Sequence, residues 1–112
     1  MKKVEAIIRT SKFEDVHAAL SQIGIRFMYS MEVKGFGKES SVSQTYRGAH
    51  YDVGFIPRTK LEVVITEDQL EEVVDCILTH AATGEVGDGK IFISNVDRAF
   101  RIRSREEGDA AL

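Results

Sequence analysis

Two stretches of the chain share one pattern of hydrophobic and polar positions. VEAIIRTSKFEDVHAALSQIG (4–24) and LEVVITEDQLEEVVDCILTHA (61–81) align with each other without gaps. Each begins with a short β-branched run, which is typical of a buried strand. Apolar residues then recur at i, i+3 and i+7, which places them in one stripe along a helix. Each stretch therefore predicts a strand and then a helix, with Thr10 or Ser11, and later Thr66, as the helix N-cap.

A further extended run follows each predicted helix. The first is IRFMYSMEVKGFG and the second is GDGKIFISNV. Two β-α-β units in tandem predict an α+β, ferredoxin-like fold, in which a four-stranded antiparallel sheet carries both helices on one face. The other face of the sheet is then bare and includes apolar residues, so we expect self-association to cover it.

Residues from about 37 to about 55 lack any periodicity. Loops longer than about 12–15 residues are uncommon in compact domains and are usually functional or disordered. This one contains SQTYRGAHYD (43–52), with two tyrosines, an arginine, a histidine and an aspartate. We interpret it as a functional loop or as a long β-hairpin arm. Either structure would let these side chains reach a partner.

Size and charge narrow the class of protein. The 112 residues suffice for a single domain, and the net charge of −3 argues against a general nucleic-acid or membrane-surface role. No run approaches the roughly 18 apolar residues that span a bilayer, and the start resembles no signal peptide. The lone Cys76 fits a reducing cytoplasm. The three histidines lie far apart in the sequence, so we expect no histidine metal site.

Three short pieces have the chemistry of phosphate binding. GFGK (35–38) and GDGK (87–90) each place a glycine pair before a lysine, which lets backbone N–H groups and a charge approach an anion. We expect both to flank the ends of inner strands. In FRIRSR (100–105), if it is extended, Arg101 and Arg103 project to one face as a fork for phosphate oxygens. Simple turns and a solvated basic edge remain the alternatives.

Two other classes of protein are disfavoured. An enzyme that hydrolyses or transfers a phosphate needs a general base beside a nucleophile or a metal pair, and Asp88 is the only acid among the three pieces. VKGFGK is similar to the opening of the RNA-recognition signature, but Lys38, Glu39, Ser40 and Ser41 stand where the stacking aromatics would follow. We therefore expect neither an enzyme nor a nucleic-acid-binding protein.

The motifs VEAIIR, EVKGFG, YRGAHYDVGFIP, TGEVGDGKIFIS and RIRSREEG together resemble the PII signal-transduction proteins, in order and over the whole chain. The resemblance implies one domain, residues 1–112, with a T-loop (about 37–55), a B-loop (about 83–90) and a C-terminal loop (about 95–112). It implies a homotrimer that binds ATP or ADP with Mg²⁺ in clefts between subunits, with 2-oxoglutarate as an effector. Such a protein is a cytoplasmic regulator.

The resemblance also implies a partner and the residues of each site. The T-loop would dock on an ammonium transporter, which is the only link to a membrane, on a nitrogen-assimilation enzyme or on a sensor kinase. Arg47, Tyr46 and Tyr51 would contact this partner, and Tyr51 matches the tyrosine that some bacterial members carry as a uridylylation site. The residues implied for the nucleotide are Gly37, Lys38, Gly87, Asp88, Gly89, Lys90, Arg101 and Arg103 around the phosphates, and Ile7, Gly35, Glu62 and Val64 around the base and ribose.

Four positions depart from the family pattern. Glu39 replaces a glutamine that helps to hold magnesium and 2-oxoglutarate, and Arg58 replaces a lysine that holds the effector. Phe27 and Tyr29 replace a small residue and a threonine beside the adenine. Glu39 could ligate the magnesium of Mg-ATP, but two like charges about 5 Å apart repel by roughly 3 kcal/mol at an effective dielectric of 20.

That repulsion corresponds to about a hundredfold in affinity. We therefore predict that ATP and ADP binding is retained and that the 2-oxoglutarate response is weakened or replaced. Arg58 would compensate for the lost affinity by donating two N–H bonds to a carboxylate, or would pair with Glu39. The alternative is a divergent PII-like sensor of a different small anion or nucleotide.

Overall fold

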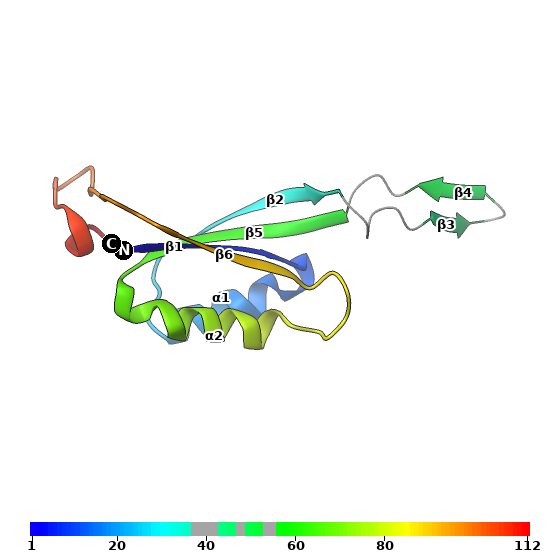
Figure 1. The fold of residues 1–112 in the computed structure, drawn as a ribbon, viewed down its shortest axis with the longest axis horizontal. Coiled ribbons are helices and arrows are strands. Elements are labelled where there is room, and N and C mark those ends of the chain that lie inside the picture. Colours follow the sequence, from blue (N-terminus) through cyan, green and yellow to red (C-terminus); the bar gives the residue numbers. More distant parts are fainter. Residues whose placement is uncertain (37–42, 47–48, 53–55) are drawn as a thin grey trace.

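The computed structural model describes residues 1–36, 43–46, 49–52 and 56–112, and for 43–46 and 49–52 it describes the backbone alone. Figure 1 shows the arrangement of the elements along the chain. Their bounds are β1 Lys2–Ile8, η1 Thr10–Lys12, α1 Phe13–Gln22, β2 Tyr29–Gly35, β3 Ser43–Tyr46, β4 Ala49–Asp52, β5 Ile56–Ile65, η2 Glu67–Gln69, α2 Leu70–Ala81, β6 Gly89–Asn95 and η3 Gly108–Ala111.

The main sheet has four antiparallel strands in the order β2-β5-β1-β6. Both α1 and α2 lie on one face of it (Figure 1). The predicted ferredoxin-like double β-α-β fold is therefore confirmed. The expectation that the glycine pieces flank inner strands is wrong. The first strands of the two units, β1 and β5, pair at the centre, so β2 and β6, which carry the glycines, form the edges.

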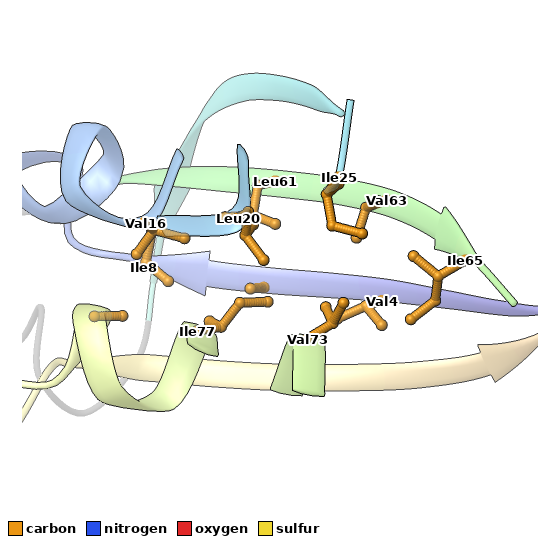
Figure 2. Packing of buried hydrophobic residues seen from close by; sticks show 12 residues of the cluster. Val4, Ile8, Val16, Leu20, Ile25, Leu61, Val63, Ile65, Val73 and Ile77 are labelled. Carbon is orange, nitrogen blue, oxygen red and sulfur yellow. The ribbon is translucent and has the colours of Figure 1, made fainter. Parts of the chain in front are cut away.

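The core fills the space between the sheet and the two helices (Figure 2). Strands β1 and β5 alternate between buried and partly exposed residues, because successive side chains point to opposite faces. The apolar stripe of each helix packs on the buried face, as the period predicted. The fully buried large side chains are Val4, Ile8, Val16, Leu20, Leu61, Ile65, Val73 and Ile77.

The predicted helix N-caps have different outcomes. Thr66 and Gln69 form a capping box at the start of the second helical segment, where Gln69 Oε1 accepts the Thr66 backbone N–H at 3.0 Å. The prediction for Thr10 or Ser11 is wrong, because the residues at the cap positions are Arg9 and Lys12 and neither makes a side-chain cap. Thr10 Oγ1 instead accepts a hydrogen bond from Thr59 Oγ1 at 3.0 Å, which ties this turn to β5.

A second, two-stranded sheet lies between β2 and β5 in the chain. Strands β3 and β4 pair antiparallel, from Ser43↔Asp52 to Tyr46↔Ala49. The hairpin extends beyond the end of the main sheet at which Gly35 pairs with Ile56 (Figure 1). The backbone of these eight residues thus follows the hairpin alternative.

The segment FRIRSR is not extended, so that premise of the sequence prediction is wrong. Residues 102–104 form a turn, and Arg105 has a φ of 63°. The turn is closed by backbone hydrogen bonds from Arg101 N–H to the Glu106 carbonyl (2.9 Å) and from Arg105 N–H to the Arg101 carbonyl (2.8 Å). Ile102, at the turn, is 96% exposed.

In the described part of the chain, no helix is long and apolar enough to cross a membrane.

Substitution of Gly89, the first residue of β6, is expected to destabilise the fold strongly. Its φ is 101°, and a Cβ there would lie 1.7 Å from the Ile7 carbonyl oxygen. We expect Gly89→Ala to lower the free energy of unfolding by about 3 kcal/mol or more, because backbone must move. Gly24→Ala is the matched control: Gly24 has a φ of 93° with nothing within 4 Å, so we expect a loss of about 1 kcal/mol. Urea unfolding at one protein concentration measures both, and equal losses would contradict the prediction.

Candidate functional site

The loop between α2 and β6 is folded around the carboxylate of Asp88. One oxygen, Oδ2, accepts the backbone N–H groups of Thr83 (2.8 Å) and Gly84 (2.9 Å). The other, Oδ1, accepts the Thr83 hydroxyl at 2.5 Å and the Arg9 Nε–H at 2.9 Å. These contacts, the Thr83 hydroxyl first and Arg9 next, hold the pKa of Asp88 far below its usual range. Asp88 is therefore an ionised brace inside the loop, with both oxygens occupied.

Two arginines hold the loop from the other side. Arg9 Nη2 donates to the Val86 carbonyl at 2.8 Å, and Arg58 Nε donates to the Gly87 carbonyl at 3.1 Å. Arg58 Nη1 also donates to the Pro57 carbonyl at 2.8 Å, which joins the loop to the start of β5.

Gly87 lies directly beneath the two guanidinium groups. Its φ is 102°, and a Cβ there would lie 2.7 Å from Arg58 Nη2 and 3.3 Å from Arg9 Nη2. The two cations therefore converge on one point of the backbone, and the nearby Asp88 carboxylate offsets one of the two charges. The result is a local surplus of positive charge suited to a small anion.

The strand register places most of the other predicted residues along the sheet. Lys90 pairs with Ile7 and Gly89 with Ile8, while Gly35 ends β2 at the same end of the sheet as the loop. Glu62 pairs with Glu5 and Val64 with Lys3, farther along β5. Ile7, Glu62 and Val64 alternate with buried residues, so all three lie on the face without helices. The structure thus places the loop, Gly35 and Ile7 at the same end of the sheet.

Arg101 and Arg103 lie at the opposite end. Strand β6 runs away from the loop for seven residues, which is about 20 Å, and the C-terminal segment begins beyond it (Figure 1). Arg101 Nη1 contacts Glu106 Oε1 at 3.3 Å, and Arg101 Nη2 donates to the Leu112 carbonyl at 3.3 Å. One chain therefore cannot place these arginines beside its own glycine–lysine loop.

A closed ring of ion pairs occupies the centre of the open sheet face. Lys3 lies 2.9 Å from Glu5 and 4.0 Å from Glu62, and Lys60 lies 3.6 Å from Glu5 and 3.1 Å from Glu62. The hydrogen bond between Lys3 and Glu5 raises the pKa of the lysine and lowers that of the glutamate. The face also carries apolar residues, as expected: Ile7 and Val64 are partly exposed on the central strands, and Tyr29, Met31 and Phe92 are exposed on the edge strands.

Several predicted site residues lie outside the described residues: Gly37, Lys38, Glu39 and Arg47. Tyr46 and Tyr51 belong to β3 and β4, of which only the backbone is described. Their roles stay predictions.

Sequence reasoning missed the contributions of Arg9 and Thr83. Thr83 is five residues before Asp88, and a hydroxyl so near an acid in a glycine-rich loop is a usable local signal. Arg9 is 79 residues away from Asp88, so no local pattern pairs them. The ion-pair ring had a signal in the alternation of Lys3 with Glu5 and of Lys60 with Glu62.

Fold and site together define a ferredoxin-like α+β protein with a glycine-rich loop between α2 and β6 that two arginines hold in place. The family model described as "Nitrogen regulatory protein P-II" matches residues 1–106. The chain belongs to this family, as its motifs predicted.

Relatives and a solved structure agree over nearly the full length. The chain is 49% identical to "Nitrogen regulatory protein P-II" of Klebsiella oxytoca and 48% identical to "Nitrogen regulatory protein P-II 1" of Escherichia coli (strain K12), over 112 residues and 100% of both chains in each case. It superposes on Arabidopsis thaliana PII bound to citrate with a TM-score of 0.82 and 38% identity, covering 99% of this chain and 91% of that one.

The low pKa of Asp88 predicts a pH-dependent contribution to stability. A carboxyl whose pKa is lowered by folding stabilises the fold above its unfolded pKa of about 4, and loses this contribution as the pH falls below it. We expect the difference in urea midpoint between the unaltered chain and Asp88→Asn to shrink between pH 5 and about pH 2. Asp97→Asn, at an exposed position, is the control. A difference independent of pH would contradict the prediction.

Proposed function

We propose that this chain is the subunit of a homotrimeric regulator that binds ATP or ADP between neighbouring copies. Binding would be transmitted through residues 37–55 to a protein partner in nitrogen metabolism, in the cytoplasm. The observation that carries this proposal is the separation of the phosphate-type residues. The loop that ends in GDGK (87–90), called here the glycine–lysine loop, lies at one end of β6. The turn that carries Arg101 and Arg103, called here the arginine turn, lies beyond the other end, about 20 Å away.

A site divided in this way needs a second chain. If the loop of one copy meets the arginine turn of the next, the contact is heterologous, and repeated contacts of this kind close into a ring. In the main sheet as described, β2 and β6 are edge strands that pair on one side only, and the exposed Met31 and Phe92 lie on them; both features support contacts between copies. The number three comes from the family resemblance.

The braced loop supplies the phosphate half of this site. Arg9 and Arg58 hold the carbonyls of Val86 and Gly87, and Asp88 holds the N–H groups at the start of the loop. The glycine backbone before Lys90 is thereby preorganised for an anion, which reduces the ordering cost of binding. Mg²⁺ would accompany the phosphates, with Glu39 as its candidate protein ligand.

The effector of this regulator would be a small carboxylate. The convergence of Arg9 and Arg58 over Gly87 is suited to such an anion, and the structurally similar Arabidopsis protein was solved with citrate. We propose that 2-oxoglutarate binds here weakly, because of Glu39, or that another small anion replaces it. The second possibility is supported by Arg58, whose Nε and Nη1 are already engaged by carbonyls of its own chain.

The protein would act by binding and not by catalysis. The carboxylate around which the loop folds, Asp88, has both oxygens occupied and a strongly lowered pKa, so it is a poor general base. The partner would be an ammonium transporter or a nitrogen-assimilation enzyme, contacted by Arg47, Tyr46 and Tyr51. Tyr51 would be the position of any covalent modification.

Subunit complementation tests the divided site. In Lys90→Ala the loop half is impaired, and in Arg103→Ala the arginine half is impaired, so we expect each homotrimer to bind Mg-ATP at least about tenfold more weakly. When the two variants are mixed, each mixed ring contains one site with both halves intact. Equal mixing should restore about one quarter of the wild-type capacity, measured by calorimetry.

A site within one chain would give no restoration on mixing, which would contradict the proposal. Light scattering after size exclusion checks the assembly in parallel. If the unaltered chain is monomeric and does not bind ATP, the proposal as a whole is contradicted.

Glu39→Gln tests the effector part of the proposal. Removing the negative charge should strengthen 2-oxoglutarate binding in the presence of Mg-ATP by up to about a hundredfold. Glu32→Gln, on the exposed part of β2, is the control and should change nothing. Tight, ATP-dependent 2-oxoglutarate binding by the unaltered chain would contradict the assigned role of Glu39.

A further inference from the structure

A pocket lies between helix α2 and the edge strand β6, on the helix side of the sheet. Its volume is about 300 Å³, and the apolar residues that line it include Val74, Leu78, Ile91 and Ile93. Leu78 and Ile93 are 55% and 46% exposed, so the pocket is open to solvent. In the main sheet as described, β6 pairs with β1 alone, so a neighbouring molecule can approach the pocket from this edge.

The same pocket borders the glycine–lysine loop. Gly89 and Lys90 line it at the end where β6 begins. In the proposed nucleotide site, Arg101 and Arg103 of the next copy meet this loop. Ile102 lies between the two arginines in the chain, and consecutive Cα atoms are only about 3.8 Å apart. The two arginines therefore bring the Ile102 side chain to the mouth of the pocket when they reach the loop.

Ile102 has the properties of an anchor for this pocket. Its side chain is 96% exposed, so it does not fill the pocket of its own chain. Turns are usually built from glycine, proline, asparagine, aspartate or serine, so the turn itself gives no reason for a β-branched apolar residue. Backbone hydrogen bonds of Arg101 with Glu106 and Arg105 close the turn and hold Ile102 outward before any contact forms. Such preorganisation lowers the ordering cost of binding.

We propose that Ile102 of one copy inserts into the pocket between α2 and β6 of the next copy. This inference rests on the proposed assembly and names the side chain and the pocket that join neighbouring copies. Ile102 is then a positioning residue, because its insertion sets Arg101 and Arg103 at the glycine–lysine loop. Full burial of an isoleucine side chain changes a dissociation constant by about tenfold to a hundredfold, and a closed ring repeats this contact at every interface.

The first experiment measures assembly. Ile102→Asp places a charge in an apolar pocket, so we expect the assembly to dissociate at protein concentrations at least about tenfold higher than for the unaltered chain. Light scattering after size exclusion measures this. Circular dichroism should be unchanged, because Ile102 is exposed within its own chain. Ala18→Asp, at an exposed position of α1, is the matched control and should assemble normally.

The second experiment identifies the two surfaces by cross-linking. Cys76→Ser removes the cysteine of the chain, and Ile102→Cys and Leu78→Cys are then made in separate chains, one with a longer tag, and co-expressed. A mild oxidant should join the two thiols as a disulfide between copies. The product is a mixed dimer band on a denaturing gel, which a reducing agent removes. Ala18→Cys in place of Leu78→Cys is the control and should give no mixed dimer.

The outcomes separate this inference from the proposed function. An Ile102→Asp chain that assembles normally, or an assembled chain without the mixed dimer, would overturn the pocket contact and leave the nucleotide site standing. Loss of Mg-ATP binding without dissociation would also overturn it, because Ile102 would then act at the nucleotide. If the mixed dimer forms but the unaltered chain does not bind Mg-ATP, the contact is supported and the nucleotide part of the proposed function fails. A monomeric unaltered chain would contradict both.

Discussion

The length of strand β6 is the constraint on which the rest of this molecule depends. Its seven residues hold the glycine–lysine loop and the arginine turn about 20 Å apart. A strand inside a hydrogen-bonded sheet cannot fold back on itself, so the two cationic parts of one chain cannot share one polyphosphate. In the proposed nucleotide site, the polyphosphate would therefore contact the loop of one copy and the turn of another, and assembly and ligand binding would be linked.

Within the loop, a single carboxylate organises a positive site. Asp88 takes up the free N–H groups of Thr83 and Gly84 and fixes Arg9, while Arg58 fixes the carbonyl of Gly87. The negative charge is used internally, and the surplus positive charge remains for an anion. Because Arg58 also contacts the Pro57 carbonyl, the loop is joined to the strand that follows residues 37–55. In the proposed function, this connection is a physical route by which an anion bound at the loop would act on residues 37–55.

The open sheet face combines two kinds of surface. The ring of Lys3, Glu5, Lys60 and Glu62 is neutral as a unit, so covering it costs less than covering four separate charges. The exposed Phe92 and Met31 lie at the margins on the two edge strands. In the proposed assembly other copies would cover this face, and the alternating charges of the ring would restrict how a neighbour lies on it.

Periodicity and motifs determined much of this protein before any coordinates. The alternation in β1 and β5 and the helical stripes predicted the double β-α-β fold, since burial of one face imposes these periods. The glycines of GDGK (87–90) predicted a turn, and both Gly87 and Gly89 have a positive φ, while anion binding there stays a prediction.

Tertiary structure decided what depends on contacts between distant residues. The strand order put the glycine pieces at edge strands, and the closing hydrogen bonds of the C-terminal segment made FRIRSR a turn. Arg9 became the partner of Asp88 across 79 residues, and Tyr29 the neighbour of Glu62 across a strand pair. A sequence pattern reports the local period of burial, and the pairing of two segments is set by how their surfaces pack.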